Sequence, residues 1–233
     1  MQRTTGTGAR RPAPPALKAG GARRAQIAVG AAVLLLLALW AFCPSSLSKV
    51  ANLRSGGKNV IAFGDSLTAG YGAGPGEDYP TRLSALIGEP VTNAGVSGDT
   101  TESALGRLDA DVLARDPRVV IIGLGGNDFL RGVPIATTEE TLHTIVRKTH
   151  AAGAMVVLLG YRFPSLSANY GKMYEAVAES EGCLLVRNLL SGILTDSSLK
   201  SDEIHPNARG YALIAERIAG PLKKLIRKAN STR

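Results

Sequence analysis

Short apolar runs separated by longer amphipathic segments make up most of the chain after residue 58. The runs are rich in valine, isoleucine and leucine, and three of the five are followed directly by glycine, which is typical of strands. The runs 119–124 and 155–159 lack the alternation of apolar and polar residues seen in half-exposed strands, so we expect both to be buried on two faces. The predicted strands span residues 59–63, 91–93, 119–124, 155–159 and 184–186.

The segments between these strands carry apolar residues at helical spacing. A strand followed by a helix that leads to the next strand is the pattern of a parallel sheet with right-handed crossovers. We therefore predict an α/β fold, a three-layer α/β/α sandwich built on about five parallel strands. The predicted helices span residues 80–87, 101–115, 138–152, 170–181 and 208–227.

The positive charge of the chain is concentrated before this region. The 233 residues carry a formal net charge of +8. Residues 1–58 hold nine Lys or Arg and no acidic residue, which leaves 18 basic against 19 acidic residues in the remainder. The strand and helix region is thus nearly neutral, which argues against a nucleic-acid-binding surface. Residues 1–24 have little that could form a core, so we expect a disordered basic arm.

An uncharged apolar run of 16 residues, 27–42, follows the arm. As a helix it would span roughly 24 Å, short of the roughly 30 Å core of a bilayer unless its neighbours are included. We expect residues 25–43 to be an uncleaved transmembrane signal-anchor, with a cleaved signal peptide as the alternative, and residues 44–58 to be a linker. The basic residues before the run predict a cytoplasmic amino terminus. The rest would then be anchored to the inner membrane, facing the periplasm or the outside, or be secreted after cleavage.

Neither a disulfide framework nor a metal or cofactor site is predicted. The two cysteines are Cys43 in the apolar run and Cys183, which we expect to be a small buried hydrophobic residue. His143 and His150 have no cysteine or carboxylate cluster beside them, so we expect surface histidines. Glycines follow two of the strands but match neither the dinucleotide nor the phosphate-loop fingerprint.

A serine stands directly after the first predicted strand, in Gly64-Asp65-Ser66-Leu67. Ligands of open α/β sheets bind at the carboxyl ends of the strands. At such a position Ser66 could act as a nucleophile, and its backbone amide could donate to a developing oxyanion. The alternative is a turn serine that caps the next segment.

Complementary groups follow other strands and precede the last helix. After the second strand, Gly95 has no side chain to block its amide from a substrate oxygen. After the third, Asn127 can offer a side-chain N–H donor. Asp202 precedes His205 by three residues, so Asp202 could hold one imidazole nitrogen while the other faces Ser66.

These residues resemble the blocks that define the SGNH hydrolases of the GDSL type. That family has a serine in Gly-Asp-Ser-Leu, a glycine, an asparagine in Gly-x-Asn-Asp and a histidine in Asp-x-x-His, and all four occur here in that order within residues 59–229. The resemblance implies a flavodoxin-like sheet of order 2-1-3-4-5. It also implies Ser66 as nucleophile, His205 as base and Asp202 as its orienting carboxylate, with an oxyanion hole from the amides of Ser66 and Gly95 and from Asn127.

The sequence around these blocks is most similar to the bacterial periplasmic branch of the family, which has thioesterase, arylesterase and lysophospholipase activity. Two further stretches of that branch occur at 162–164 and 169–171, separated by a longer spacer, 165–168. We therefore expect a monomeric serine esterase that hydrolyses carboxylic ester or thioester bonds of small acyl or lipid substrates. The alternatives are an O-deacetylase of carbohydrate or cell-wall sugars in the same family, and an inactive binding domain on a membrane anchor.

Three further acidic residues stand beside the candidate catalytic groups. We expect Asp65 and Asp128 to fix their loops through hydrogen bonds rather than to take part in the chemistry. Glu203 is the alternative to Asp202 as the carboxylate that orients His205.

Overall fold

The computed structural model describes residues 46–162 and 168–232. It contains the strands β1 (Asn59–Gly64), β2 (Val91–Gly95), β3 (Pro117–Gly123), β4 (Met155–Leu159) and β5 (Leu184–Val186). They form a five-stranded sheet of order β2-β1-β3-β4-β5 in which every pairing is parallel. This confirms the predicted α/β architecture and the expected strand order.

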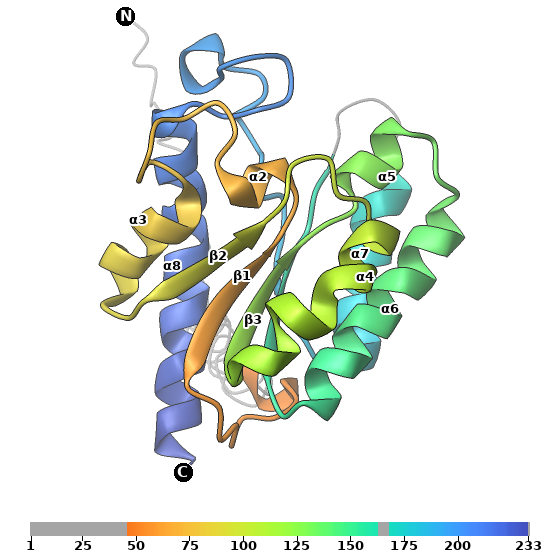
Figure 1. Ribbon diagram of the computed structural model, residues 1–233, viewed down its shortest axis with the longest axis vertical. Coiled ribbons are helices and arrows are strands. Elements are labelled where there is room, and N and C mark those ends of the chain that lie inside the picture. Colours follow the sequence, from red (N-terminus) through yellow and green to blue (C-terminus); the bar gives the residue numbers. More distant parts are fainter. Residues whose placement is uncertain (1–45, 163–167, 233) are drawn as a thin grey trace, which may run out of the picture. The chain divides into compact units, whose positions relative to one another are not determined.

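Helices lie on both faces of the sheet and complete the three layers (Figure 1). They are α2 (Ser66–Ala69), α3 (Tyr79–Ile87), α4 (Thr101–Asp111), α5 (Gly126–Leu130), α6 (Ile135–Ala151), α7 (Ala168–Glu181) and α8 (Ala208–Ser231). α3 packs on α8 at one face, and α6 packs between α4 and α7 at the other. The prediction missed α2 and α5, because helices of 4 and 5 residues are too short to show helical periodicity.

The core lies on both sides of β3 and β4. All 7 residues of β3 and all 5 of β4 are buried, as their unbroken apolar sequences predicted. α8 turns one face to the sheet because its apolar residues recur every three or four positions, as at Tyr211, Ile214 and Ile218. This packing makes the sheet a scaffold that positions the loops at the carboxyl ends of its strands.

The segment expected to be a linker, 44–58, is in part a packed element of the fold. Val50 is buried, and the backbone N–H of Ala51 donates to the carbonyl of Gly182 at 2.9 Å. The side chain of Asn52 donates to the carbonyls of His150 and Ala154 at 2.9 and 3.0 Å. The sequence did not indicate these contacts, because short irregular segments that pack on a domain lack a periodic pattern.

The surroundings of His143 and His150 differ from those expected of surface histidines, and Cys183 is partly buried against the core. The His143 side chain is only 15% exposed and its Nδ1 lies 2.6 Å from Glu181 Oε1, while His150 is half-buried, so neither is a freely exposed surface histidine. Burial raises the pKa of Cys183 to about 12, which keeps its thiol neutral. Within the described ranges, no group of His, Cys, Asp and Glu is placed to hold a metal ion.

The predictions for the first 43 residues fall outside the described part of the chain. These are the basic arm, 1–24, and the anchor or signal peptide, 25–43. Most of the spacer 165–168 also lies outside it. Among the residues that the structure does describe, we find no helix long and apolar enough to span a bilayer.

Candidate active site

Ser66 stands at the first position of α2, directly beyond the carboxyl end of β1. Asp65 caps α2, because its Oδ1 accepts the backbone N–H of Leu67 at 3.0 Å. Gly64 lies so close to Thr68 that a side chain at this position would overlap it. The tight strand-to-helix turn leaves the backbone N–H of Ser66 without an acceptor in the described ranges, as is usual for the first N–H of a helix.

The loop before α8 brings His205 to this serine. Ser66 Oγ lies 2.9 Å from His205 Nε2, and His205 Nδ1 lies 2.7 Å from Asp202 Oδ2. The loop is closed by an antiparallel bridge between Lys200 and Pro206. The two ring nitrogens of His205 therefore face a hydroxyl on one side and a carboxylate on the other.

Asp202 is the carboxylate on His205, and the alternative, Glu203, lines the neighbouring cleft instead. The second oxygen of Asp202 accepts the backbone N–H groups of Ile204 and His205 at 2.9 and 2.8 Å. Desolvation works against ionisation of Asp202, but these hydrogen bonds and the one to the imidazole outweigh it and hold its pKa below the usual value. Asp202 is thus a fixed negative partner for the imidazole.

Asn127 reaches the same site from α5. Its Nδ2 donates one hydrogen bond to the carbonyl of Asp99 at 2.9 Å, and its side chain lines the cleft together with Ser66. A carboxamide nitrogen carries two hydrogens, so a second donor remains. Asp128 accepts the backbone N–H and the hydroxyl of Thr101 at 2.9 and 2.6 Å, which ties α5 to the start of α4.

Gly95 does not offer the free amide that was expected. Its N–H donates to Asn93 Oδ1 at 2.9 Å, and a side chain here would overlap the backbone of Thr68 and Ala69. The glycine is needed for close packing of β2 against α2. Three residues on, Gly98 has a left-handed φ of 86°, and its N–H meets no acceptor in the described ranges. Sequence reasoning missed Gly98, since Ser-Gly-Asp reads as an ordinary turn.

Asp65 is buried behind the serine. Burial raises its pKa to about 7, against the hydrogen bond from Leu67, and the nearby carboxylates of Asp99 and Asp128 add to the rise. Its partner is the backbone of α2, and the imidazole's carboxylate partner is Asp202. Asp65 and Asp128 thus make the loop-fixing hydrogen bonds that were expected of them.

A cleft of about 340 Å³ opens beside Ser66, and its walls are mainly apolar. Leu130 is 53% and Ile204 is 39% exposed, so both present apolar surface at its edge. Leu190 and Leu194 come from the connection between β5 and α8, where no motif in the sequence indicated a role in the site. The apolar lining residues are Leu67, Phe129, Leu130, Leu190, Leu194 and Ile204.

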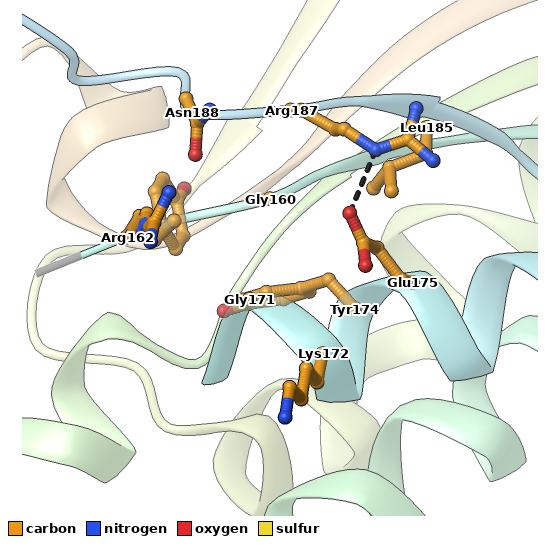
Figure 2. A pocket seen from close by; sticks show the side chains of 10 residues that line it. Gly160, Arg162, Gly171, Lys172, Tyr174, Glu175, Leu185, Arg187 and Asn188 are labelled. Carbon is orange, nitrogen blue, oxygen red and sulfur yellow. Dashed lines mark hydrogen bonds and ion pairs between the residues drawn. The ribbon is translucent and has the colours of Figure 1, made fainter. Parts of the chain in front are cut away.

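A second hollow, of about 260 Å³, lies between the ends of β4 and β5 and the start of α7 (Figure 2). Its charged lining includes Arg187 and Glu175, which pair with each other at 2.9 Å. None of the candidate catalytic residues lines it. The cleft beside Ser66 is therefore the candidate active site.

Comparison with known proteins agrees with this geometry. A model of the GDSL-like Lipase/Acylhydrolase family matches residues 62–213. Esterase TesA of Pseudomonas aeruginosa is 32% identical over 74% of this chain and 92% of its own length. Thioesterase 1/protease 1/lysophospholipase L1 of Escherichia coli is 34% identical over 72% of this chain and 84% of its own length. A crystal structure of TesA, 31% identical, superposes with a TM-score of 0.68 over 72% of this chain and 99% of that one. The chain therefore belongs to the GDSL-like lipase and acylhydrolase family, a family of serine ester hydrolases.

Proposed function

We propose that Ser66, His205 and Asp202 act as a catalytic triad for acyl transfer to water. Ser66 Oγ attacks the carbonyl carbon of the ester while His205 Nε2 takes its proton, and Asp202 holds the opposite N–H and stabilises the imidazolium. His205 then returns the proton to the departing alcohol or thiol, which leaves an acyl-enzyme. A water molecule activated by His205 releases the acid. The distance of 2.9 Å between Ser66 Oγ and His205 Nε2 carries this proposal.

The oxyanion formed in each step needs donors on the opposite side from His205. We assign this role to the backbone amide of Ser66 and the second N–H of Asn127. For the third donor we replace Gly95 by Gly98, because the Gly95 amide is already bonded and that of Gly98 has no acceptor in the described ranges. Donors that are fixed before charge develops lower the barrier without having to reorganise.

The substrate we propose is a carboxylic ester or thioester with an apolar acyl chain. The mainly aliphatic walls of the cleft favour burial of hydrocarbon over binding of a sugar. A series of p-nitrophenyl esters and acyl-CoA thioesters of increasing chain length should show kcat/KM rising beyond acetate. Acetylated sugars are the contrasting arm, and preference for them would favour the deacetylase alternative.

Ser66→Ala tests the nucleophile. The variant should lose ester hydrolysis and covalent labelling by a fluorophosphonate probe, because the hydroxyl that His205 Nε2 faces is removed. Ser97→Ala is the control, since Ser97 is an exposed serine on a neighbouring loop. Labelling that survives in Ser66→Ala and maps to Ser97 would overturn the assignment, and a wild-type chain that is never labelled would favour the inactive binding domain.

We also propose that the enzyme acts on the far side of the cytoplasmic membrane as a monomer, held by residues 25–43. The uncharged run and the basic residues before it support this location. Secretion after signal cleavage is the alternative. The near-neutral remainder of the chain gives no reason to expect a nucleic-acid partner.

A further inference from the structure

Arg107, on α4, is a largely buried cation that the proposed mechanism does not use. Its side chain is 18% exposed. The guanidinium donates to the carbonyls of Gly64 and Ala94 at 2.9 and 3.0 Å. It also pairs with the carboxylates of Asp99 and Asp111 at 2.6 and 2.8 Å. Four of its five N–H groups are therefore engaged.

Two of these acceptors, the carbonyls of Gly64 and Ala94, fix the ends of β1 and β2, the strands that lead to the candidate oxyanion donors. Gly64 is the last residue of β1, and Ser66 follows two residues later. The Gly64 carbonyl also accepts the N–H of Val96 at 3.0 Å, so it joins the end of β1 to the turn after β2. The guanidinium lies 4.4 Å from the centre of the Phe63 ring, which adds a cation–π contact from β1 itself.

The third acceptor links Arg107 to Asn127. Arg107 Nε and Ser103 Oγ hold the two carboxylate oxygens of Asp99 at 2.6 and 2.8 Å. The carbonyl of the same aspartate accepts Asn127 Nδ2 at 2.9 Å. Asp99 is therefore the single residue that links the Asn127 amide to the Arg107 guanidinium. Gly98 immediately precedes Asp99.

We infer that Arg107 is a positioning residue for the oxyanion hole. It sets where the Ser66 amide, the turn of Gly98 and the Asn127 amide stand relative to one another. It is not among the residues that line the cleft, so it acts through these groups rather than on substrate. The inference rests on the proposed function, which assigns those three donors.

The planar fork of arginine is what this position requires. Its donors point in fixed directions and can meet four acceptors from β1, β2, the Asp99 loop and α4 at once. A lysine ammonium keeps the charge but reaches fewer of them, and a glutamine removes the charge as well. Small displacements of donors at an oxyanion hole reduce kcat more than KM, because the donors matter most as charge develops.

The test compares Arg107→Gln and Arg107→Lys with wild type on p-nitrophenyl acetate, with rates divided by active sites titrated with a fluorophosphonate. We expect Arg107→Gln to lower kcat by about 10- to 100-fold with KM within about threefold, and Arg107→Lys to lie in between. Arg115→Gln is the matched control, since Arg115 lies beyond the end of α4 and pairs with the same carboxylate, Asp111, at 3.1 Å. Its kcat should stay within about twofold of wild type.

A double-mutant cycle with Asn127→Ala separates positioning from general stabilisation. If Arg107 acts through the oxyanion hole, Arg107→Gln should cost less than about threefold in the Asn127→Ala background, because part of the hole is already lost. Equal cost in both backgrounds would overturn the inference. So would an unchanged kcat per active site with a lower melting temperature.

Misfolding of Arg107→Gln and failure of the proposed function can both be told apart from failure of the inference. If Arg107→Gln does not fold, the same cycle is run with Arg107→Lys, which keeps the charge beside Asp99 and Asp111. Equal cost in both backgrounds, or an unchanged kcat per active site with a lower melting temperature, would again overturn the inference. Failure of the proposed function has a different signature, because Ser66→Ala would then keep its hydrolytic rate and its label. An inactive Ser66→Ala with a fully active Arg107→Gln would reject the inference alone.

Discussion

Asp65 and Ser66 are neighbours in sequence, yet the structure gives their side chains opposite surroundings. Ser66 faces the cleft and the imidazole of His205. Asp65 faces the core, where burial raises its pKa to about 7. Burial disfavours the ionised form of this carboxyl group, so near pH 7 Asp65 fixes the turn with only part of a full negative charge.

The raised pKa of Asp65 makes stability depend on pH. The folded state holds the proton more tightly than the unfolded state, so the stabilisation is fully present below the unfolded pKa of 3.8 and is lost as pH rises through about 7. Asp65→Asn keeps the side-chain oxygen that caps α2 and cannot ionise. Relative to wild type, it should gain on the order of 2–3 kcal/mol of unfolding free energy between pH 5 and pH 8.

Urea unfolding of both proteins at the two pH values measures this gain. Asp109→Asn is the control, because Asp109 is an exposed carboxylate paired with Lys148 at the surface. A wild type and an Asp65→Asn variant whose curves shift in parallel with pH would contradict the prediction.

Asn127 should matter to the rate far more than to binding. Asn127→Ala removes a donor whose effect grows as charge develops on the substrate oxygen, so kcat should fall by on the order of 10² to 10³ with a smaller change in KM. Steady-state kinetics on a short soluble ester give both values. Asn59→Ala is the control, since Asn59 bonds the carbonyl of Arg115 at the amino end of β1. An unchanged kcat in Asn127→Ala would leave Asn127 as a loop residue.

The sequence predicted the residue types of the site better than their individual hydrogen bonds. Ser66, His205, Asp202 and Asn127 stand in motifs, and the fold brings all four to one edge. The state of the Gly95 amide could not be predicted, because it depends on a bond to Asn93 that no spacing rule indicates. The proximity of Arg107 to β1 is likewise a product of tertiary packing.

The elements that carry the site follow from the sequence to different degrees. The buried strands β3 and β4 were predicted because an unbroken apolar run of their length is typical of a strand covered on both faces. The short helices α2 and α5, which carry Ser66 and Asn127, were not predicted. They begin at a capping side chain and at a glycine with positive φ, and neither feature produces a periodic pattern. Gly125, for example, has a φ of 104° directly before α5.

The packed segment before β1 should contribute to the stability of the fold. A chain that starts at residue 46 keeps buried Val50 and both hydrogen bonds of Asn52. A chain that starts at residue 56 loses them and should unfold with several kcal/mol less free energy, since one buried valine contributes about 1.5–3 kcal/mol and each hydrogen bond about 0.5–1.5. Val50→Ala in the longer chain should show part of this loss. Equal urea midpoints for the two truncated chains would show that the segment does not stabilise the fold.

In the described part of the chain, the candidate catalytic residues lie at the carboxyl ends of the strands, and the segment that leads into the sheet lies at the opposite end of β1. Ser66 lies beyond the carboxyl end of β1, whereas residues 46–58 lead into the amino end of the same strand (Figure 1). Every residue assigned to the candidate site therefore lies in the described part of the chain. Membrane attachment and catalysis should be separable.

Truncation before residue 46 should separate catalysis from membrane attachment. A chain that starts at residue 46 should hydrolyse a short soluble ester with the same kcat and KM as the full chain, because every residue assigned to the site lies after position 58. The full chain, expressed in a bacterium, should remain with the membrane fraction after high-salt and carbonate washing, and protease added outside the inner membrane should reach the catalytic region. The shorter chain, without the apolar run, should be recovered in the soluble fraction.

A soluble product of the full chain that lacks residues 25–43 would identify the run as a cleaved signal peptide. Loss of short-ester activity in the shorter chain would show that the first 45 residues contribute to the active enzyme.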